Sequence, residues 1–272
     1  MRELPIVGAA LTLDGFAMLR DDMFGMDRDL ELQDFHAPSV LQGDIDALVD
    51  RAQAALAGYQ GRHGLHGPFW DLPLATWDPD IRKVIHDRMF RALDVCEALG
   101  STHMVVHSPY TEWDHFNIDT YPNARDGIFE RFHTTMAPVC KRAADIGTTL
   151  VLENIGDIDP QFRVDLAASF KSEAFQISID TGHAHYVHRR LEAPPLDDFV
   201  STAQEALQHV HLQDNDGLAD SHWALGAGTI NWHSFFAALG QLNRQPRLII
   251  EVFAVECVRK SIAYLQAQGL AR

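Results

Sequence analysis

Imidazole and carboxylate side chains recur at regular places along this chain, each near the end of a short apolar segment. In chain order they are His66, His107, Glu153, Asp180, His211 and Glu251. Three more, His183, Asp220 and His222, follow closely after two of these segments. Histidine combined with aspartate or glutamate is a donor set that suits zinc, manganese, iron or cobalt. The pattern therefore predicts a site for divalent metal ions where the segments meet.

Each of these residues has a simpler structural explanation when it is taken alone. A histidine at a strand end is often a hydrogen-bonded core residue, and an acidic residue there often caps the next helix. Six such residues on successive segments are harder to explain in this way. Few Lys or Arg residues stand beside them, and unpaired carboxylates that are buried together are costly. Bound cations would remove that cost.

The segments that carry these residues alternate with helix-like segments along the whole chain. We predict strands over residues 6–13, 30–35, 64–69, 103–109, 149–155, 176–183, 209–215 and 247–252. Apolar residues at i, i+3 and i+4 predict helices over 44–59, 79–99, 127–146, 196–208 and 255–268. Eight strands alternating with helices over about 250 residues are typical of an α/β (β/α)8 TIM barrel. We therefore predict a single TIM-barrel domain over residues 1–272. A doubly wound open sheet is the alternative, but no G-x-G-x-x-G or P-loop follows the first strand.

A closed barrel would bring the ligand-type residues together at one rim, where the active sites of such barrels lie. Side chains alternate across a strand, so the residue two positions earlier also faces inward. At most strands this residue is small or apolar, as are Gly64, Val105 and Val151. The ligand-type residues would thus form the layer above a packed interior.

The remaining histidines are assigned other roles. His209 shares a face with His211 one layer deeper, where we expect it to support its neighbour through a hydrogen bond. His185 and His188 follow the turn after Asp180, and we expect them in a solvated loop. His103 lies at a strand start, and we interpret it as a surface or packing residue.

The composition limits the classes of partner. The chain has 38 acidic and 22 basic residues and a net charge of -16, which repels a phosphate backbone, so nucleic acid is not expected as a partner. Three widely spaced cysteines give neither a disulfide framework nor a zinc motif and fit a reducing cytoplasm. No apolar stretch approaches the ~20 residues that cross a bilayer, and the apolar start lacks the features of a signal peptide. We expect a cytoplasmic protein with a small-molecule substrate and no membrane partner.

Seven short motifs in register carry a family resemblance. "HGPF", "VVHSP", "LEN", "IDTGHAH", "HVHLQDNDG", "DSH" and "IIEV" occur in this order on successive predicted strands and the loops after them. Together they resemble the xylose isomerase-like TIM barrels over residues 6–255. The resemblance implies a barrel of that type with metal ions at its mouth.

The resemblance implies two alternative uses of these residues. Sugar and sugar-phosphate isomerases and epimerases of this family hold one divalent ion and move protons around an enediol with two glutamates. Their four ligands are matched here by Glu153, Asp180, His211 and Glu251. The endonuclease IV subgroup holds three zinc ions with five further ligands, matched here by His66, His107, His183, Asp220 and His222. In that arrangement Glu153 bridges the first and second metals.

The sequence departs from both subgroups. "LGAGTINW" (225–232) resembles a loop of the sugar isomerase-like members, and the basic DNA-gripping loops of an abasic-site nuclease are missing. Where ketose epimerases place an arginine, this chain has Gly217. The acidic residue that those enzymes place after the fifth-strand glutamate is matched here only by Asp159. Five aromatic residues near the rim are candidates for the walls of a sugar pocket: Phe69, Trp70, Tyr110, Trp113 and Trp223.

Nine matched ligands exceed what isomerisation needs. We therefore expect first a metal-dependent hydrolase that acts on a small, sugar-containing phosphate ester, with up to three ions, zinc favoured over manganese, iron or cobalt. The alternative is a sugar or sugar-phosphate isomerase or epimerase with Glu153 and Glu251 as the acid/base pair. An abasic-site DNA endonuclease and a non-catalytic metal-binding protein are the further alternatives.

Overall fold

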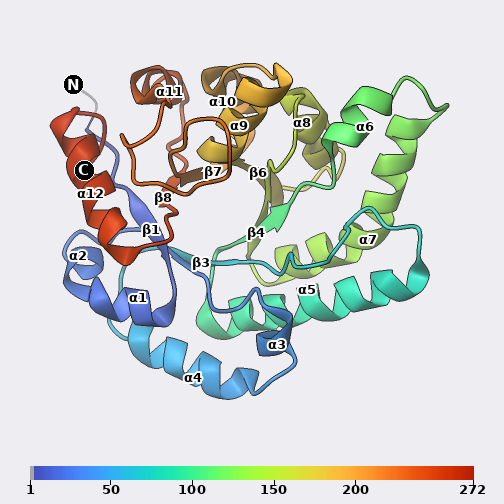
Figure 1. The fold of residues 1–272 in the computed structure, drawn as a ribbon. Helices are drawn as coiled ribbons and strands as arrows, with labels where there is room; N and C mark the ends of the chain where they lie inside the picture. The colour runs from blue at the N-terminus through green and yellow to red at the C-terminus, as the bar shows by residue number, and fades with distance from the viewer. Residues whose placement is uncertain (1–2) are drawn as a thin grey trace.

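Eight parallel strands form a closed barrel in the computed structural model, which describes residues 3–272 (Figure 1). They are β1 (Gly8–Leu11), β2 (Leu30–Leu32), β3 (His63–His66), β4 (His103–His107), β5 (Thr149–Glu153), β6 (Phe175–Asp180), β7 (Leu207–Leu212) and β8 (Arg247–Ile250). The barrel closes where β1 pairs with β8, Ala9 opposite Ile250. All eight predicted strands and the TIM-barrel fold are confirmed, and the open-sheet alternative is wrong because an open sheet leaves these two edges unpaired.

Helices surround the barrel on the outside (Figure 1). They are α1 (Leu13–Met18), α2 (Arg20–Phe24), α3 (Pro38–Leu41), α4 (Ile45–Leu56), α5 (Pro79–Leu99), α6 (Glu112–Asn117), α7 (Ala124–Asp145), α8 (Pro160–Ala168), α9 (Thr181–Leu191), α10 (Leu196–Ala203), α11 (Trp232–Leu239) and α12 (Val255–Ala267). The helix predicted over 79–99 has these bounds because Asp78 caps its first turn and Gly100 takes the left-handed conformation at its end. The helix predicted over 196–208 ends at Ala203, since a 3-10 turn (Gln204–Ala206) leads directly into β7.

The junction of β6 and α9 differs from the predicted turn and loop. Asp180 ends β6 and is also the N-cap of α9, where its side chain accepts a hydrogen bond of 2.7 Å from the backbone N–H of His183. The helix therefore starts at Thr181, and the prediction of a solvated loop for His185 is wrong: it lies on α9 and is buried. The side chain that caps a helix here also points into the barrel mouth, which the spacing alone did not indicate.

Two layers of side chains fill the fold. The larger apolar layer lies between sheet and helices and includes Leu32, Met104 and Ile179. Alternate strand residues face the barrel axis. There Val105 and Val151 are buried beside polar groups that are equally buried: Glu31, His103, Ser178, His209 and His211. The interior is thus more polar than the predicted layer of small and apolar residues.

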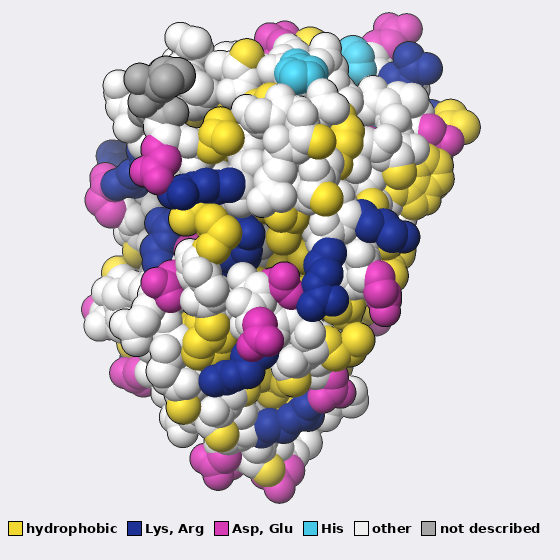
Figure 2. Space-filling view, turned by 90° about the vertical axis from the view of Figure 1, so that its left-hand side faces the viewer, with side chains coloured by type: hydrophobic (Ala, Val, Ile, Leu, Met, Phe, Trp, Pro, Cys, Tyr) yellow, Lys and Arg dark blue, Asp and Glu magenta, His cyan; other side chains and the backbone are white. Residues whose placement is uncertain are grey.

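Opposite charges pair over the outer surface. On the face shown in Figure 2, Lys and Arg side chains lie among Asp and Glu side chains. Arg259 on α12 pairs with Asp22 on α2 at 2.7 Å, and Arg62 lies against Asp29 at 2.5 Å. The backbone N–H of Arg272, the last residue, donates to the Pro5 carbonyl. Among the described residues no helix is long and apolar enough to cross a bilayer.

The contact between β1 and β2 requires a glycine at position 8. A Cβ built on Gly8 would lie 1.9 Å from the backbone carbonyl oxygen of Asp29, so the strand would have to move. We expect Gly8→Ala to lower the free energy of unfolding by about 1–3 kcal/mol or more, measured by urea denaturation. Gly156→Ala is the control, because its nearest neighbour would lie 3.7 Å away, and it should change stability by less than about 1 kcal/mol. Equal stability of the two variants would contradict this account of the strand contact.

Candidate metal centre

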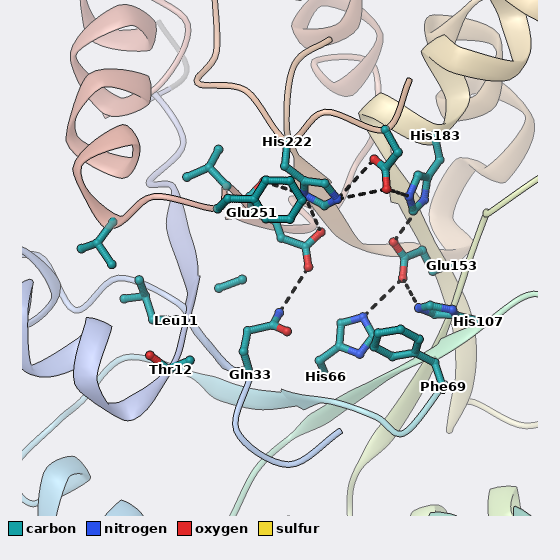
Figure 3. Close-up of a pocket in the computed structure, with 15 residues that line it drawn as sticks. Leu11, Thr12, Gln33, His66, Phe69, His107, Glu153, His183, His222 and Glu251 are labelled. Carbon is teal, nitrogen blue, oxygen red and sulfur yellow. Dashed lines mark hydrogen bonds and ion pairs between the residues drawn. The ribbon is translucent and has the colours of Figure 1, made fainter. Parts of the chain in front are cut away.

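A cavity of about 390 Å³ opens at the C-terminal ends of the strands (Figure 3). Its polar lining comes from seven elements or the loops after them: Gln33, His66, His107, Glu153, His183, Asp220, His222 and Glu251. Leu11, Phe69, Val252 and Phe253 form much of the apolar remainder. The rim expected from the sequence therefore borders one cavity large enough for a small molecule.

The nine predicted ligands fall into three groups, and within each group one donor atom per residue lies within 4.8 Å of the others. The first group consists of His66, His107 and Glu153. The two histidine Nε2 atoms lie 3.9 and 3.6 Å from Glu153 Oε2. His66 Nδ1 donates to the carbonyl oxygen of Gly67 at 2.9 Å, which leaves its Nε2 lone pair directed at the carboxylate. Phe69 stacks on His107 at 4.5 Å.

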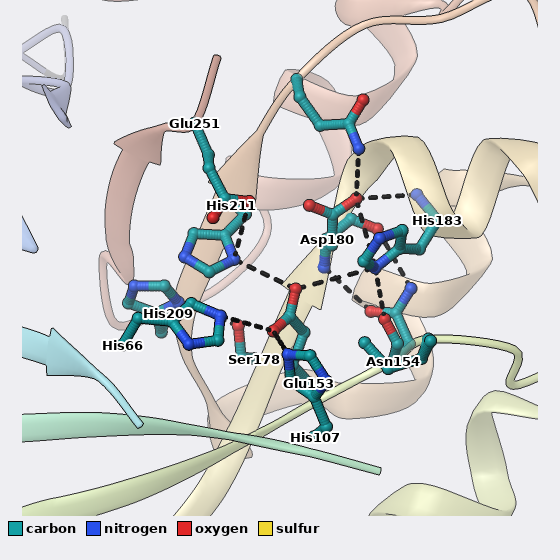
Figure 4. Close-up of polar contacts among 12 residues, drawn as sticks. His66, His107, Glu153, Asn154, Ser178, Asp180, His183, His209, His211 and Glu251 are labelled. Carbon is teal, nitrogen blue, oxygen red and sulfur yellow. Dashed lines mark hydrogen bonds and ion pairs between the residues drawn. The ribbon is translucent and has the colours of Figure 1, made fainter. Parts of the chain in front are cut away.

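The second group consists of Glu153, Asp180, His211 and Glu251 (Figure 4). Strand pairing places Asp180 opposite His211. His211 Nδ1 lies 3.1 Å from Glu153 Oε1 and 3.5 Å from Glu251 Oε2. Glu153 belongs to the first group as well, so its two oxygens face two different sets of donors, Oε2 the first and Oε1 the second.

The third group consists of His183, Asp220 and His222. Both histidine Nε2 atoms lie 3.2 Å from the Asp220 carboxylate. His183 Nδ1 donates to the carbonyl oxygen of Asn154 at 2.9 Å, and His222 Nδ1 donates to that of Glu251 at 3.2 Å. Both rings are therefore oriented by the backbone, with the nitrogen nearer the carboxylate available to an ion.

Burial and charge show that these groups suit cations. Glu153 Oε2 and Asp180 Oδ2 are buried without a hydrogen-bond partner. Burial, together with the nearby Glu153 and Glu251 carboxylates, raises the pKa of Asp180 to about 6. Burial opposes a charged His211, but the carboxylates of Glu251, Glu31 and Glu153 outweigh it and raise the pKa of His211 well above its usual value. Unpartnered carboxylate oxygens facing imidazoles are a donor set that fits divalent ions.

Two polar side chains outside the groups hold Asp180 in place. Asn154 accepts from the Asp180 backbone N–H at 2.9 Å and donates to its carbonyl at 3.0 Å. Arg163, fully buried, donates to Asn154 Oδ1 at 3.0 Å. Gln213 donates to Asp180 Oδ1 at 3.3 Å and to Asp220 Oδ1 at 2.6 Å, which links the second and third groups.

The five aromatic candidates are placed differently from one another. Phe69 lines the cavity, and Trp70 stacks on its outer side at 5.1 Å but is half exposed. Tyr110 is buried against the ring of Phe162. The side chains of Trp113 and Trp223 are exposed. Of the five candidates, Phe69 alone is part of the cavity lining.

Sequence reasoning missed two residues on β2 and just after it that belong to this region. Glu31 lies in the barrel interior with its Oε1 atom 2.9 Å from His211 Nε2, and Gln33 donates to Glu251 Oε1 at 3.3 Å. A charged and an amide residue alternate with leucines in "LELQ", and this alternation is the signal that could have identified them. His103, interpreted as a surface or packing residue, is buried 3.4 Å from Glu31.

The family comparison covers most of the chain. The sequence model described as "Xylose isomerase-like TIM barrel" matches residues 15–268. Among curated proteins, an uncharacterized protein of Methanocaldococcus jannaschii is 26% identical over 196 residues, which are 69% of this chain. The ketose 3-epimerase of Arthrobacter globiformis is 25% identical over 199 residues, 70% of this chain. The chain spans 63% of the length of each of these two relatives.

Solved structures share the fold over nearly the whole chain. A D-tagatose 3-epimerase-like protein has a TM-score of 0.78 at 21% identity, with 97% of this chain and 98% of that chain covered. A protein of Thermus thermophilus, from a crystal soaked with ZnCl2, has a TM-score of 0.71 at 25% identity, with 98% and 99% covered.

Metal binding should release protons. Although burial opposes it, the hydrogen bond to Asp220 and the charges of Glu251 and Asp180 raise the pKa of His222 to about 9. A metal ligand must be neutral, so at pH 7 this imidazole loses its proton on binding, and affinity should rise with pH up to about 9. Zinc titration by calorimetry in buffers of different ionisation enthalpy measures this release. His233→Ala, on α11, should not alter it, whereas His222→Ala should reduce it; heats that are independent of the buffer would contradict the expectation.

Proposed function

Because the chain belongs to the xylose isomerase-like TIM barrel family, we propose that it is a divalent-metal-dependent sugar or sugar-phosphate isomerase or epimerase. The observation that carries this proposal is the position of Glu153 and Glu251, whose carboxylates lie 3.1 and 3.5 Å from His211 Nδ1 and which both line the cavity. Two carboxylates beside one metal group are what proton transfer next to a sugar carbonyl requires.

The ion would be held by the second group, Glu153, Asp180, His211 and Glu251. When bound, it supplies Lewis-acid polarisation of a sugar carbonyl and neighbouring hydroxyl. One glutamate removes the proton from the carbon beside the carbonyl, and the other returns a proton. Return to the same carbon from the opposite face gives the epimer, whereas return to the former carbonyl carbon gives the aldose or ketose isomer.

The cavity offers contacts suited to a sugar. Gln33, which also donates to Glu31 at 3.0 Å, presents its amide between two carboxylates at one wall. Phe69 and Phe253 provide apolar surface, with Phe253 lying 4.6 Å from the ring of His222. Amide groups and aromatic faces together bind the hydroxyl groups and the C–H faces of a sugar ring. This lining supports a small polar substrate.

The comparisons favour this function over the phosphoester hydrolysis that we expected first. A relative is named ketose 3-epimerase, and a structural neighbour is titled D-tagatose 3-epimerase-like. Both names concern epimerisation at carbon 3 of a sugar, a reaction that the two glutamates of the second group could carry out by proton transfer. The alternative function of the sequence analysis thus becomes the main proposal.

Hydrolysis stays as a second candidate because of one observation. The first and third groups assemble at the same cavity although proton transfer does not need them. Three ions at these groups could activate a water molecule and bind phosphate oxygens. The similarity to a protein whose crystal was soaked with ZnCl2 is consistent with zinc, and the donor sets suit manganese, iron and cobalt as well.

Glu153→Gln and Glu251→Gln test the acid/base pair. In D2O, the wild-type protein with zinc, manganese or cobalt should exchange deuterium into a ketohexose or ketose phosphate, as measured by NMR over a substrate panel. Each variant should exchange about 10²–10⁴-fold more slowly, because an amide does not transfer the proton. Trp113→Ala, on an exposed side chain outside the cavity, serves as the control. Absence of exchange across the panel for every metal would reject the proposal.

His66→Ala and His222→Ala separate the two candidates. If proton transfer at the second group is the function, each variant should lower the number of bound ions, measured by elemental analysis, and keep the deuterium exchange within about tenfold. If hydrolysis is the function, each should abolish cleavage of a phosphate-ester panel, since removal of a metal ligand removes an ion that the reaction needs. If the two variants lose deuterium exchange and the protein cleaves no phosphate ester, both candidate functions are contradicted in their present form.

A further inference from the structure

A buried polar cluster lies in the barrel interior below the cavity. We call Glu31, His103 and His209 the interior triad; all three are at most 2% exposed. The Nε2 atoms of His103 and His209 lie 3.4 and 3.0 Å from Glu31 Oε2. Glu31 was not singled out from the sequence, and His103 was interpreted as a surface or packing residue. Neither the three metal groups nor the proposed proton transfer uses the triad.

The triad resembles a fourth metal group, but the contact between Arg247 and His103 is against one. The Glu31 carboxylate accepts hydrogen bonds from His211 and Gln33 at Oε1, while the rings of His103 and His209 lie near Oε2 without a hydrogen bond to it. Arg247 contacts His103 Nδ1, and a guanidinium only donates. His103 Nδ1 therefore accepts, its Nε2 carries the proton, and that nitrogen has no lone pair for an ion.

The same reasoning sets the protonation of the other two rings. His209 Nε2 lies 3.0 Å from Glu31 Oε2, which favours a proton on that nitrogen, and the Ser178 hydroxyl then donates to His209 Nδ1 at 2.8 Å. Figure 4 shows Ser178, His209 and His211 together with the carboxylates of the second group. His211 Nε2 likewise carries the proton that it shares with Glu31 at 2.9 Å.

His211 is oriented differently from three of the other candidate histidine ligands. His66, His183 and His222 donate from Nδ1 to a backbone carbonyl and present Nε2 to their group. His211 donates from Nε2 to Glu31 and directs Nδ1 at Glu153, on the side where an ion would displace the Nδ1 proton. Among the contacts of the described residues, no backbone carbonyl accepts a hydrogen bond from the ring of His211. The acceptor is the side-chain carboxylate of Glu31, which comes from β2 across the barrel.

We propose that Glu31 is a positioning residue, which holds His211 in the tautomer with the proton on Nε2 and so presents Nδ1 to the ion of the second group. The rings of His103 and His209 lie 3.4 and 3.0 Å from the oxygen that His211 does not use, and they limit where the Glu31 carboxylate can lie. A carboxylate–histidine–metal arrangement of this kind also increases the basicity of the ligand nitrogen. The inference rests on the proposed function only in requiring that the second group binds a metal.

Glu31→Gln tests this role without reference to turnover. It keeps the shape of the side chain but replaces acceptor positions by donors. In a His66→Ala/His222→Ala background, which retains the second group, zinc affinity is measured by competition with a chromophoric chelator. We expect Glu31→Gln to weaken binding about 10–100-fold. Asp34→Asn is the matched control. It removes one negative charge from a side chain that accepts a hydrogen bond from the Leu13 N–H, and it should leave the zinc affinity within about threefold.

Two outcomes of the titration would overturn the proposal. One is equal zinc affinity with and without Glu31→Gln in folded protein. The other is a fourth zinc ion per wild-type chain that Glu31→Gln alone removes, which would make the interior triad a metal site. If the second group binds no metal in the background variant although it does so in the wild type, the same titration is carried out on the wild-type chain, where only the affinity of one ion should fall.

A measurement on the wild-type protein keeps the proposal testable if Glu31→Gln does not fold. Long-range ¹H–¹⁵N NMR of zinc-loaded, ¹⁵N-histidine-labelled protein reports which nitrogen of each ring carries a proton. The ring that is absent from spectra of His211→Gln should be protonated at Nε2. A proton on Nδ1 of His211 would refute the assignment. Deuterium exchange into sugars plays no part in either readout, so failure of the isomerase proposal and failure of this one are distinguishable.

Discussion

Carboxylates that lie close together in a largely buried site are stable only where positive charge lies between them, and the mouth of this barrel gathers four of them: Glu153, Asp180, Asp220 and Glu251. Barrel closure brings them together, because each comes from a different strand or the loop after it. Imidazole rings lie between the carboxylates. The negative charge of the carboxylates raises the pKa values of His211 and His222. The helix cap at Asp180 and the buried Asn154 hold this arrangement around the cavity against the repulsion between the carboxylates.

Fixed acceptors outside the groups decide which histidine nitrogen faces an ion. Backbone carbonyls do so for His66, His183 and His222. These carbonyls belong to residues at the strand ends, so the barrel itself sets the ring orientation. His211 is deeper and fully buried, where the carbonyls of neighbouring strands are committed to sheet pairing. A side-chain acceptor in the interior, Glu31, replaces them, at the cost of one more buried charge that needs its own donors.

The sequence predicts the strands well because each ends in a polar residue after an apolar run, and the alternation within a strand predicts which residues share the barrel axis. This is how the ligand-type residues from His66 to Glu251 were found. Glu31 and His103 were not found, because their role depends on contacts across the barrel between β2, β4 and β7, and no spacing within one strand encodes such contacts. The aromatic candidates show the same limit: Phe69 lines the cavity, whereas Tyr110 packs against Phe162 outside it, a difference that loop conformation decides.

The charge balance of the mouth connects the number of ions to the kind of substrate. Burial disfavours protonation of His107 and lowers its pKa to about 3, so this ring is neutral at pH 7. His183 and His222 have raised pKa values and are protonated when no ion displaces the proton. One divalent ion together with these two imidazolium groups balances the four carboxylates, and a neutral cavity suits an uncharged sugar. Three ions would instead leave a surplus of positive charge, which would attract a phosphate ester. Under the proposed function, a cavity with a single ion is therefore the state whose charge balance suits proton transfer on a sugar.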